Sequence, residues 1–347
     1  MTPTHHNARH HARRGLPFCF AEVAVASLLI GTLYTGVYQA TLAPTPARQA
    51  TVARTSGTAR KAAHHAHRSA ASRDAESSPS THRVSGASLG ASQDLQFTGA
   101  GSFAGGTACT QLLQTAAAFE EKGYHLGIYA IDLGTGDTLA YDPDAAFYTA
   151  SAIKGPYVTS LFSLEVEKGT LSLDDALASA TPIILNSDND AYVALSDARG
   201  RQDFLAWLQS ADVSTGAYLS LDDYARPHYP LSTARQLAQE WQASYAYLTS
   251  GTAAAKALQS LFANRVTSPI RDALGASHQT WSKAGWYPTA EGDARPATND
   301  AGVVWGTAGP YVVAILSDAP EDFSSVQAVA TSVDAAMADL ASRGSAS

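Results

Sequence analysis

Cysteine is almost absent from this sequence, which holds only Cys19 and Cys109 among its 347 residues. Cys19 lies inside a long apolar run, and no second cysteine or histidine lies near Cys109 along the chain. This scarcity excludes a disulfide framework and a cysteine-based zinc site. We therefore expect Cys109 to be a small buried side chain, not a nucleophile or a metal ligand.

Lysine is also scarce, with six in the chain, and the charges are distributed unevenly. Residues 1–106 carry 10 Lys and Arg against 4 Asp and Glu, whereas residues 107–347 carry 13 against 27. The arginines of the basic part are dispersed and not interleaved with aromatic residues, so we expect no nucleic-acid partner. An anionic surface, such as lipid headgroups or a wall polymer, suits a basic tail better.

Histidine is concentrated at the start of the chain, where eight of the eleven lie at or before His82. Short histidine tracts in a solvated tail do not fix the geometry that a metal site needs. We expect neither a metal nor an organic cofactor.

The first 106 residues divide into three segments. Residues 1–15 are basic, and residues 16–43 form an apolar run broken only by Glu22. The length and basic flank of this run are typical of a transmembrane anchor, and a signal peptide cut near Ala43 is the alternative. Residues 44–106 are rich in Ala, Ser, Thr and Arg without periodicity, which predicts a disordered linker. With either interpretation we expect the acidic body to lie outside the cytoplasm, held at the cell membrane by a single N-terminal anchor or secreted after cleavage.

Residues 107–347 have the pattern of an α+β domain. A helix is predicted near 109–122, followed by the strands "HLGIYAIDL" and "DTLAYD". Several helices, three short strands and a closing helix at 324–340 follow. We expect an α/β sandwich in which N- and C-terminal helices cover one face of a five-stranded antiparallel sheet and an all-helical lobe packs on the other.

One serine in the chain stands three residues before a lysine: Ser151, with Lys154, in "FYTASAIKGPY". Residues three apart on a helix share a face, so the amine can reach the hydroxyl. A serine in the first helical turn also offers an unpaired backbone N–H at the positive end of the helix dipole. These groups meet the needs of acyl transfer, provided that burial or a second cation lowers the pKa of the lysine.

Two further motifs supply partners. Ser187, Asp188 and Asn189 form the tripeptide Ser-Asp-Asn at the start of a predicted helix, where they are also good helix-capping residues. In "WSKAGW", Lys283 lies on the first late strand as a second cation, and Gly285 permits close approach of a substrate to the backbone. The three motifs together, in this order, indicate one reaction centre.

In these motifs the sequence resembles the penicillin-recognising serine hydrolases, most closely the class A β-lactamase-like family, whose signature is S-x-x-K, S-D-N and K-T-G. The resemblance covers residues 109–340. It implies that Ser151 is the acylated nucleophile, Lys154 its base, and Ser187 the donor of a proton to the leaving amine.

The resemblance also implies the substrate-binding groups. Asn189 would hold the substrate's side-chain amide, and Lys283 would attract its carboxylate. The backbone N–H groups of Ser151 and Trp286 would form the oxyanion hole beside Gly285.

Three departures from the family pattern stand out. The interval of about 36 residues from Ser151 to Ser187 is short for the family, and Ala284 replaces the threonine whose hydroxyl would bond the substrate. The segment 218–233, which corresponds to the loop with the deacylating glutamate, contains no glutamate. Its Asp222 and Asp223 are typical of a capping pair or a solvated turn, and His228 is an alternative base.

We therefore predict an extracytoplasmic serine hydrolase that acts on β-lactams or on D-Ala-D-Ala-type cell-wall peptides and lacks the usual deacylating group. The alternative is a catalytically impaired penicillin- or peptidoglycan-binding module at the cell envelope, which Ala284 and the missing glutamate favour. A protein whose basic tail is the functional part is a third hypothesis, supported only by composition.

Overall fold

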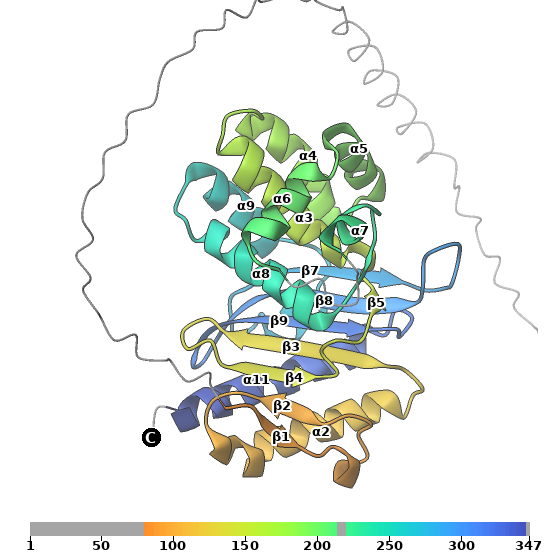
Figure 1. Cartoon of the computed structure of the whole chain (residues 1–347), viewed down its shortest axis with the longest axis vertical. Coiled ribbons are helices and arrows are strands. Elements are labelled where there is room, and N and C mark those ends of the chain that lie inside the picture. Colours follow the sequence, from red (N-terminus) through yellow and green to blue (C-terminus); the bar gives the residue numbers. More distant parts are fainter. Residues whose placement is uncertain (1–79, 214–219, 345–347) are drawn as a thin grey trace, which may run out of the picture. The chain divides into compact units, whose positions relative to one another are not determined.

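The computed structural model describes residues 80–213 and 220–344, all within one compact unit (Figure 1). The segments 1–15 and 16–43, and the linker up to residue 79, lie outside the described residues. Among the helices described, none combines the length and the apolar character that a membrane crossing requires.

The centre of the fold is a seven-stranded antiparallel sheet with the order β1-β2-β4-β3-β9-β8-β7. Five of these strands are those that the sequence predicted, and each lies within a few residues of its expected position. Their bounds are β3 Leu126–Asp132, β4 Thr138–Tyr141, β7 Thr280–Tyr287, β8 Ala297–Gly306 and β9 Gly309–Ser317.

The prediction of five strands is corrected by two short ones, β1 (His82–Val84) and β2 (Leu95–Phe97). β2 pairs with β4, opposite Leu139 to Tyr141, and β1 pairs with β2. They belong to residues that we expected to be part of the linker, so the folded domain begins well before residue 107. Leu95 and Phe97 are fully buried, which explains how so short a strand is held.

One face of the sheet is covered by helices from both ends of the domain, as predicted. α2 (Thr107–Glu120) and α11 (Phe323–Gly344) pack on each other and on this face. The short helix α10 (Pro269–Leu274) packs against α11 on the same face. Cys109 lies in this core with 1% of its surface exposed and its thiol free, in agreement with the expectation of a buried hydrophobic residue.

The other face carries the helical lobe, which Figure 1 shows above the sheet. Ser, Thr or Asp side chains cap most of its helices, and this is why the chain turns at these positions. Beside the lobe, a two-stranded sheet pairs β5 (Phe147–Tyr148) with β6 (Leu231–Ser232). The lobe helices are α3 Lys154–Leu161, α4 Leu173–Asn186, α5 Asn189–Arg199, α6 Gln202–Ser210, α7 Leu221–Ala225, α8 Ala234–Leu248 and α9 Ala253–Ala263.

Candidate active site

Ser151 lies in the first turn of the helix that follows β5. The chain enters the 3-10 turn η3 (Ala150–Ile153), which continues directly into α3. Ala150 has a φ of +44°, a left-handed conformation that costs a non-glycine residue about 1–2 kcal/mol. Strain of this kind is typical of functional sites. Ser151 itself keeps 9% of its surface exposed.

Gly285 lies against this first turn. β7 is the edge strand of the sheet, and a Cβ atom on Gly285 would lie 2.6 Å from Ser151 N and 2.3 Å from Ala152 N. Only glycine lets the strand come so close. First-turn N–H groups have no partner within the helix, and edge strands carry N–H groups that no strand pairs. The backbone of Ser151 therefore lies beside the strand segment in which Trp286 follows Gly285.

Asn299 holds the backbone before Ser151 in place. This side chain is 1% exposed on β8, and its Nδ2 donates hydrogen bonds to Tyr148 O at 2.8 Å and Thr149 O at 3.1 Å. Its Oδ1 accepts from Ser317 N at 2.9 Å, which ties the segment to the sheet. A single asparagine in a strand belongs to no motif, so sequence analysis missed it.

Lys154 is completely buried beneath the start of α5. Its Nζ donates to Ser187 O at 2.7 Å, Asp188 O at 3.2 Å and Asn189 Oδ1 at 2.6 Å. Burial lowers its pKa to about 7, although the nearby Asp188 carboxylate opposes this shift. The predicted hydrogen bond with Ser151 is not among those that Lys154 makes within the described residues, because the acceptors on Ser187, Asp188 and Asn189 use all three protons of an ammonium.

Two tyrosines complete the surroundings of Lys154. Its Nζ lies 5.4 Å from the ring centre of Tyr192 and 5.7 Å from that of Tyr229. The Tyr229 hydroxyl also donates to Asn189 Oδ1 at 3.1 Å. Burial raises the pKa of Tyr229, so at neutral pH this hydroxyl remains protonated and acts as a donor. Neither tyrosine belongs to a motif, so sequence analysis did not identify them.

Ser187 connects the two buried lysines. It ends α4 in a left-handed conformation with a φ of +59°, and this places its carbonyl toward Lys154. Its Oγ accepts a hydrogen bond from Lys283 Nζ at 2.8 Å. Asp188 then caps α5 through its carboxylate, which accepts from Ala191 N. The tripeptide is thus both a helix cap and a link between the lysines.

Lys283 reaches this point from β7 and is 2% exposed. Its Nζ also donates to Ala284 O at 2.7 Å. Burial, and next the positive charge of Lys154, hold its pKa well below the usual value, while Asp300 acts in the opposite direction. The structure therefore brings together Lys154, Ser187, Asn189 and Lys283, with Ser151 and Gly285 in contact beside them.

The segment that lacks the glutamate folds around α7. Ser220 caps this helix, and Asp223 accepts from Ser220 Oγ and from Arg226, so Asp223 is part of a capping arrangement. His228 Nε2 lies 2.8 Å from Asp197 Oδ1. Asp222 and His228 line a pocket to which none of the Ser151 cluster contributes.

No three His, Cys, Asp or Glu side chains gather closely enough to hold a metal ion anywhere in the part of the chain that the structure describes. The ionisable groups beside Ser151 are instead the two buried amines, whose proton equilibria are shifted by burial.

The fold and this arrangement place the chain among the β-lactamase-like proteins. Residues 110–181 and 177–343 match the model of the β-lactamase enzyme family. Because the match spans well over half of the sequence, the chain belongs to this family.

Solved structures agree on the fold. A β-lactamase from Chitinophaga pinensis is 18% identical, with a TM-score of 0.55 over 67% of this chain and 98% of its own. One from Burkholderia vietnamiensis is 21% identical, with a TM-score of 0.51 over 67% and 95%. A variant of the last common ancestor of Gram-negative bacteria class A β-lactamases is 20% identical, with a TM-score of 0.51 over 66% and 97%. The search of curated proteins finds no match.

Proposed function

We propose that this protein is a serine acyl-enzyme hydrolase that acts on β-lactams or on D-Ala-D-Ala-type cell-wall peptides through Ser151. The observation that carries the proposal is the cluster in which Ser187 bridges Lys154 and Lys283, two buried amines of lowered pKa, beside the first turn that holds Ser151. Burying a lysine costs free energy of folding, and buried lysines with a lowered pKa are typical of functional sites.

In the proposed acylation, Ser151 Oγ attacks the substrate carbonyl and its proton passes to the neutral amine of Lys154. As the carbonyl-nitrogen bond breaks, Ser187 Oγ gives its proton to the leaving nitrogen and is reprotonated by the ammonium of Lys283. The N–H groups of Ser151 and Trp286 stabilise the oxyanion. Asn189 keeps its Nδ2 for the substrate, because within the described residues Lys154 and Tyr229 engage its Oδ1 alone.

The substrate carboxylate has a specific effect on Lys283 in this scheme. In the free protein, burial favours the neutral amine. A carboxylate that binds beside it adds an opposite charge, which favours the ammonium form that Ser187 needs as a proton source. Ala284 adds no hydroxyl to this contact and is fully buried.

Deacylation, the removal of the acyl group from Ser151 by water, is the step that the geometry of the site supports least. Among the described residues of the segment 218–233, the side chain that lies at Lys154 and Asn189 is that of Tyr229, a protonated hydroxyl instead of a carboxylate. Such a group does not remove a proton from water. We therefore expect a long-lived acyl-enzyme.

Intact mass measured over time tests the proposal. The full chain is incubated with a labelled penicillin, alongside Ser151→Ala and the matched control Ser160→Ala, a buried serine of α3 whose hydroxyl donates only to Tyr157 O. We expect an adduct of one penicillin in the wild type and in Ser160→Ala, and none in Ser151→Ala. An adduct that vanishes indicates a β-lactamase, and one that persists a peptidase-like acylator. An adduct that survives in Ser151→Ala would refute the assignment.

A binding module without turnover is the second candidate. It is favoured by the three hydrogen bonds of Lys154, which use every proton of an ammonium and leave no lone pair for Ser151. The same experiment separates the two: the binding module retains penicillin reversibly and gives no covalent adduct.

Tyr229 gives a further prediction, because its ring lies 5.7 Å from the buried amine of Lys154. Tyr229→Ala is expected to move the pH midpoint of acylation up from about 7 toward the ordinary pKa of lysine, whereas Tyr229→Phe retains the ring and should leave the midpoint in place. The measurement is the rate of adduct formation between pH 6 and 9. Equal midpoints in the two variants would show that the ring does not set the pKa of Lys154.

Location outside the cytoplasm, held by the segment 16–43, is part of the proposal. It is supported by the basic flank and apolar length of that segment.

A further inference from the structure

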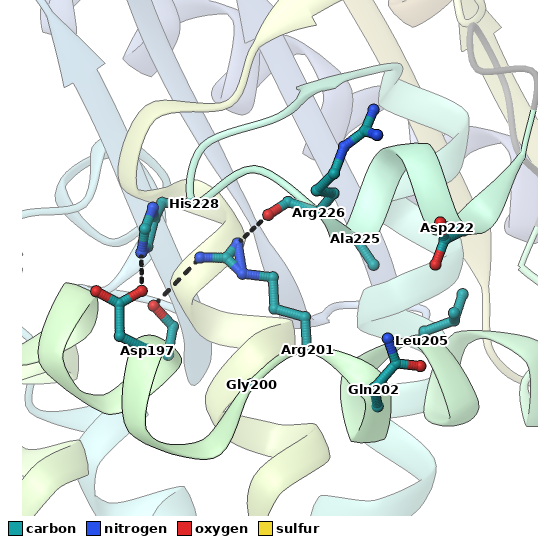
Figure 2. A pocket seen from close by; sticks show the side chains of 10 residues that line it. Asp197, Gly200, Arg201, Gln202, Leu205, Asp222, Ala225, Arg226 and His228 are labelled. Atoms are coloured by element: carbon teal, nitrogen blue, oxygen red, sulfur yellow. Dashed lines mark hydrogen bonds and ion pairs between the residues drawn. The ribbon is translucent and has the colours of Figure 1, made fainter.

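A pocket lies in the helical lobe, apart from the Ser151 cluster. It has a volume of about 400 Å³ and is formed by the end of α5, the start of α6, and α7 with the segment that follows it. This volume lies within the usual range for small-molecule sites. Figure 2 shows Arg201 across the middle of the pocket, with Asp222 on one side in this view and the pair of Asp197 and His228 on the other.

Three of the ionisable side chains around the pocket already have a side-chain partner. His228 lies against Asp197 at 2.8 Å, and Arg226 pairs with Asp223 at 3.0 Å. Two charges remain: within the described residues, Arg201 has no carboxylate partner, and Asp222 has no cationic one. One cation and one anion on the walls of the same hollow are complementary to a ligand that carries both charges.

Arg201 is held ready for such a ligand. Its Nη1 donates to Arg226 O at 2.9 Å and its Nη2 to Ser196 Oγ at 3.3 Å, which fixes the plane of the guanidinium. A guanidinium has five N–H donors, so three are left to bind a carboxylate. Arg201 also lies close enough to Tyr157, Tyr192 and Tyr229 to oppose the rise in their pKa values, which places its charge near these three buried or partly buried rings.

Tyr192 and Tyr229 connect the lining of the pocket with the surroundings of Lys154. Tyr192 donates its hydroxyl to His228 O at 2.8 Å on the pocket side, and its ring faces Lys154 on the other. Tyr229 follows His228 directly and bonds Asn189. A ligand against Arg201 and His228 would thus touch the segment that also shapes the surroundings of Lys154, without contact with Ser151.

We propose that this pocket is a second, non-catalytic binding site for a small zwitterion, a free amino acid or a short peptide with free ends, whose carboxylate binds Arg201 and whose ammonium binds Asp222.

Calorimetric titration of the full chain with the dipeptide alanyl-alanine tests this site. The N-acetylated dipeptide lacks the ammonium, the C-terminally amidated one lacks the carboxylate, and free alanine tests the shorter zwitterion. We expect the dipeptide to bind and each blocked form to bind at least about tenfold more weakly. Binding of alanine as well would extend the site to free amino acids, and binding of the dipeptide alone would restrict it to peptide ends.

Three variants locate the binding. Arg201→Gln and Asp222→Asn are each expected to weaken dipeptide binding by about tenfold or more. Asp222 is exposed, so its variant is expected to fold even if the loss of the Arg201 hydrogen bonds disturbs the lobe. Arg83→Gln, at an exposed arginine on β1, should change nothing.

Lys283→Met separates this site from the proposed active site, and dipeptide binding should persist in it. Loss of binding in Lys283→Met, unchanged binding in both pocket variants, equal binding of the blocked dipeptides, or no heat of binding with either alanine or the dipeptide at about 10 mM would each overturn the inference. None of these outcomes depends on whether Ser151 is acylated.

Discussion

Acylation of Ser151 by a penicillin is expected to slow by about 10²–10⁴-fold when Lys154 is replaced by methionine, the usual range for loss of a general base. Methionine is unbranched and apolar, so it suits the buried site between Tyr192 and Tyr229 better than a shorter residue. The measurement is the rate of adduct formation by intact mass. The matched control is Lys168→Met, at a lysine that is exposed and should affect nothing.

The pH profile shows whether Lys154 acts as the base. Its pKa is about 7, so below pH 7 it is mainly protonated and cannot accept the proton of Ser151. The wild-type rate should therefore rise with pH and reach half of its plateau near pH 7. In Lys154→Met the rise through this midpoint should disappear. The same midpoint in wild type and variant would assign it to another group, with Lys283 the next to examine.

The second large effect is expected for Gly285→Ala. The added Cβ would lie 2.3 Å from Ala152 N and 2.5 Å from Thr149 O, both backbone atoms that no side-chain rotation can move aside. Either β7 or η3 must shift, and a displacement of about 1 Å at a reaction centre can cost about 10²-fold in rate. We expect this loss in acylation, with a destabilisation of about 1–3 kcal/mol from overpacking.

The rate of adduct formation and a denaturant midpoint measure both effects of Gly285→Ala. Gly105→Ala is the matched control, because no atom lies within 4 Å of the added Cβ and its φ is not in the left-handed region. Wild-type acylation and stability in Gly285→Ala would mean that β7 does not need to approach Ser151 so closely.

The sequence was sufficient to predict the elements of the site because its three motifs lie on strongly patterned segments. The strand with Lys283 and Gly285 and the helix after Ser151 form where expected. The hydrogen-bond partners of Lys154 were not predictable from the sequence. Its partners depend on the left-handed turn at Ser187, which directs backbone carbonyls toward the amine, and a spacing of three residues carries no information about that turn.

Single side chains that act across the fold were also beyond sequence analysis. Asn299 and Tyr229 reach the site from β8 and from the segment after α7, and neither belongs to a motif. The strands β1 and β2 were missed for a related reason. Each has three residues in a stretch rich in Ser and Gly, and only pairing with the distant β4 makes them strands.

These two strands determine where the polypeptide can be shortened. A truncated chain that starts at residue 107 lacks β2, the strand that pairs with β4. The edge of β4 (Thr138–Tyr141) is then exposed, and exposed edge strands promote edge-to-edge aggregation. The truncated chain also lacks Phe97 and Phe103, which are buried in the core with their ring centres 4.9 Å apart. A soluble fragment for crystallisation should therefore begin ahead of His82.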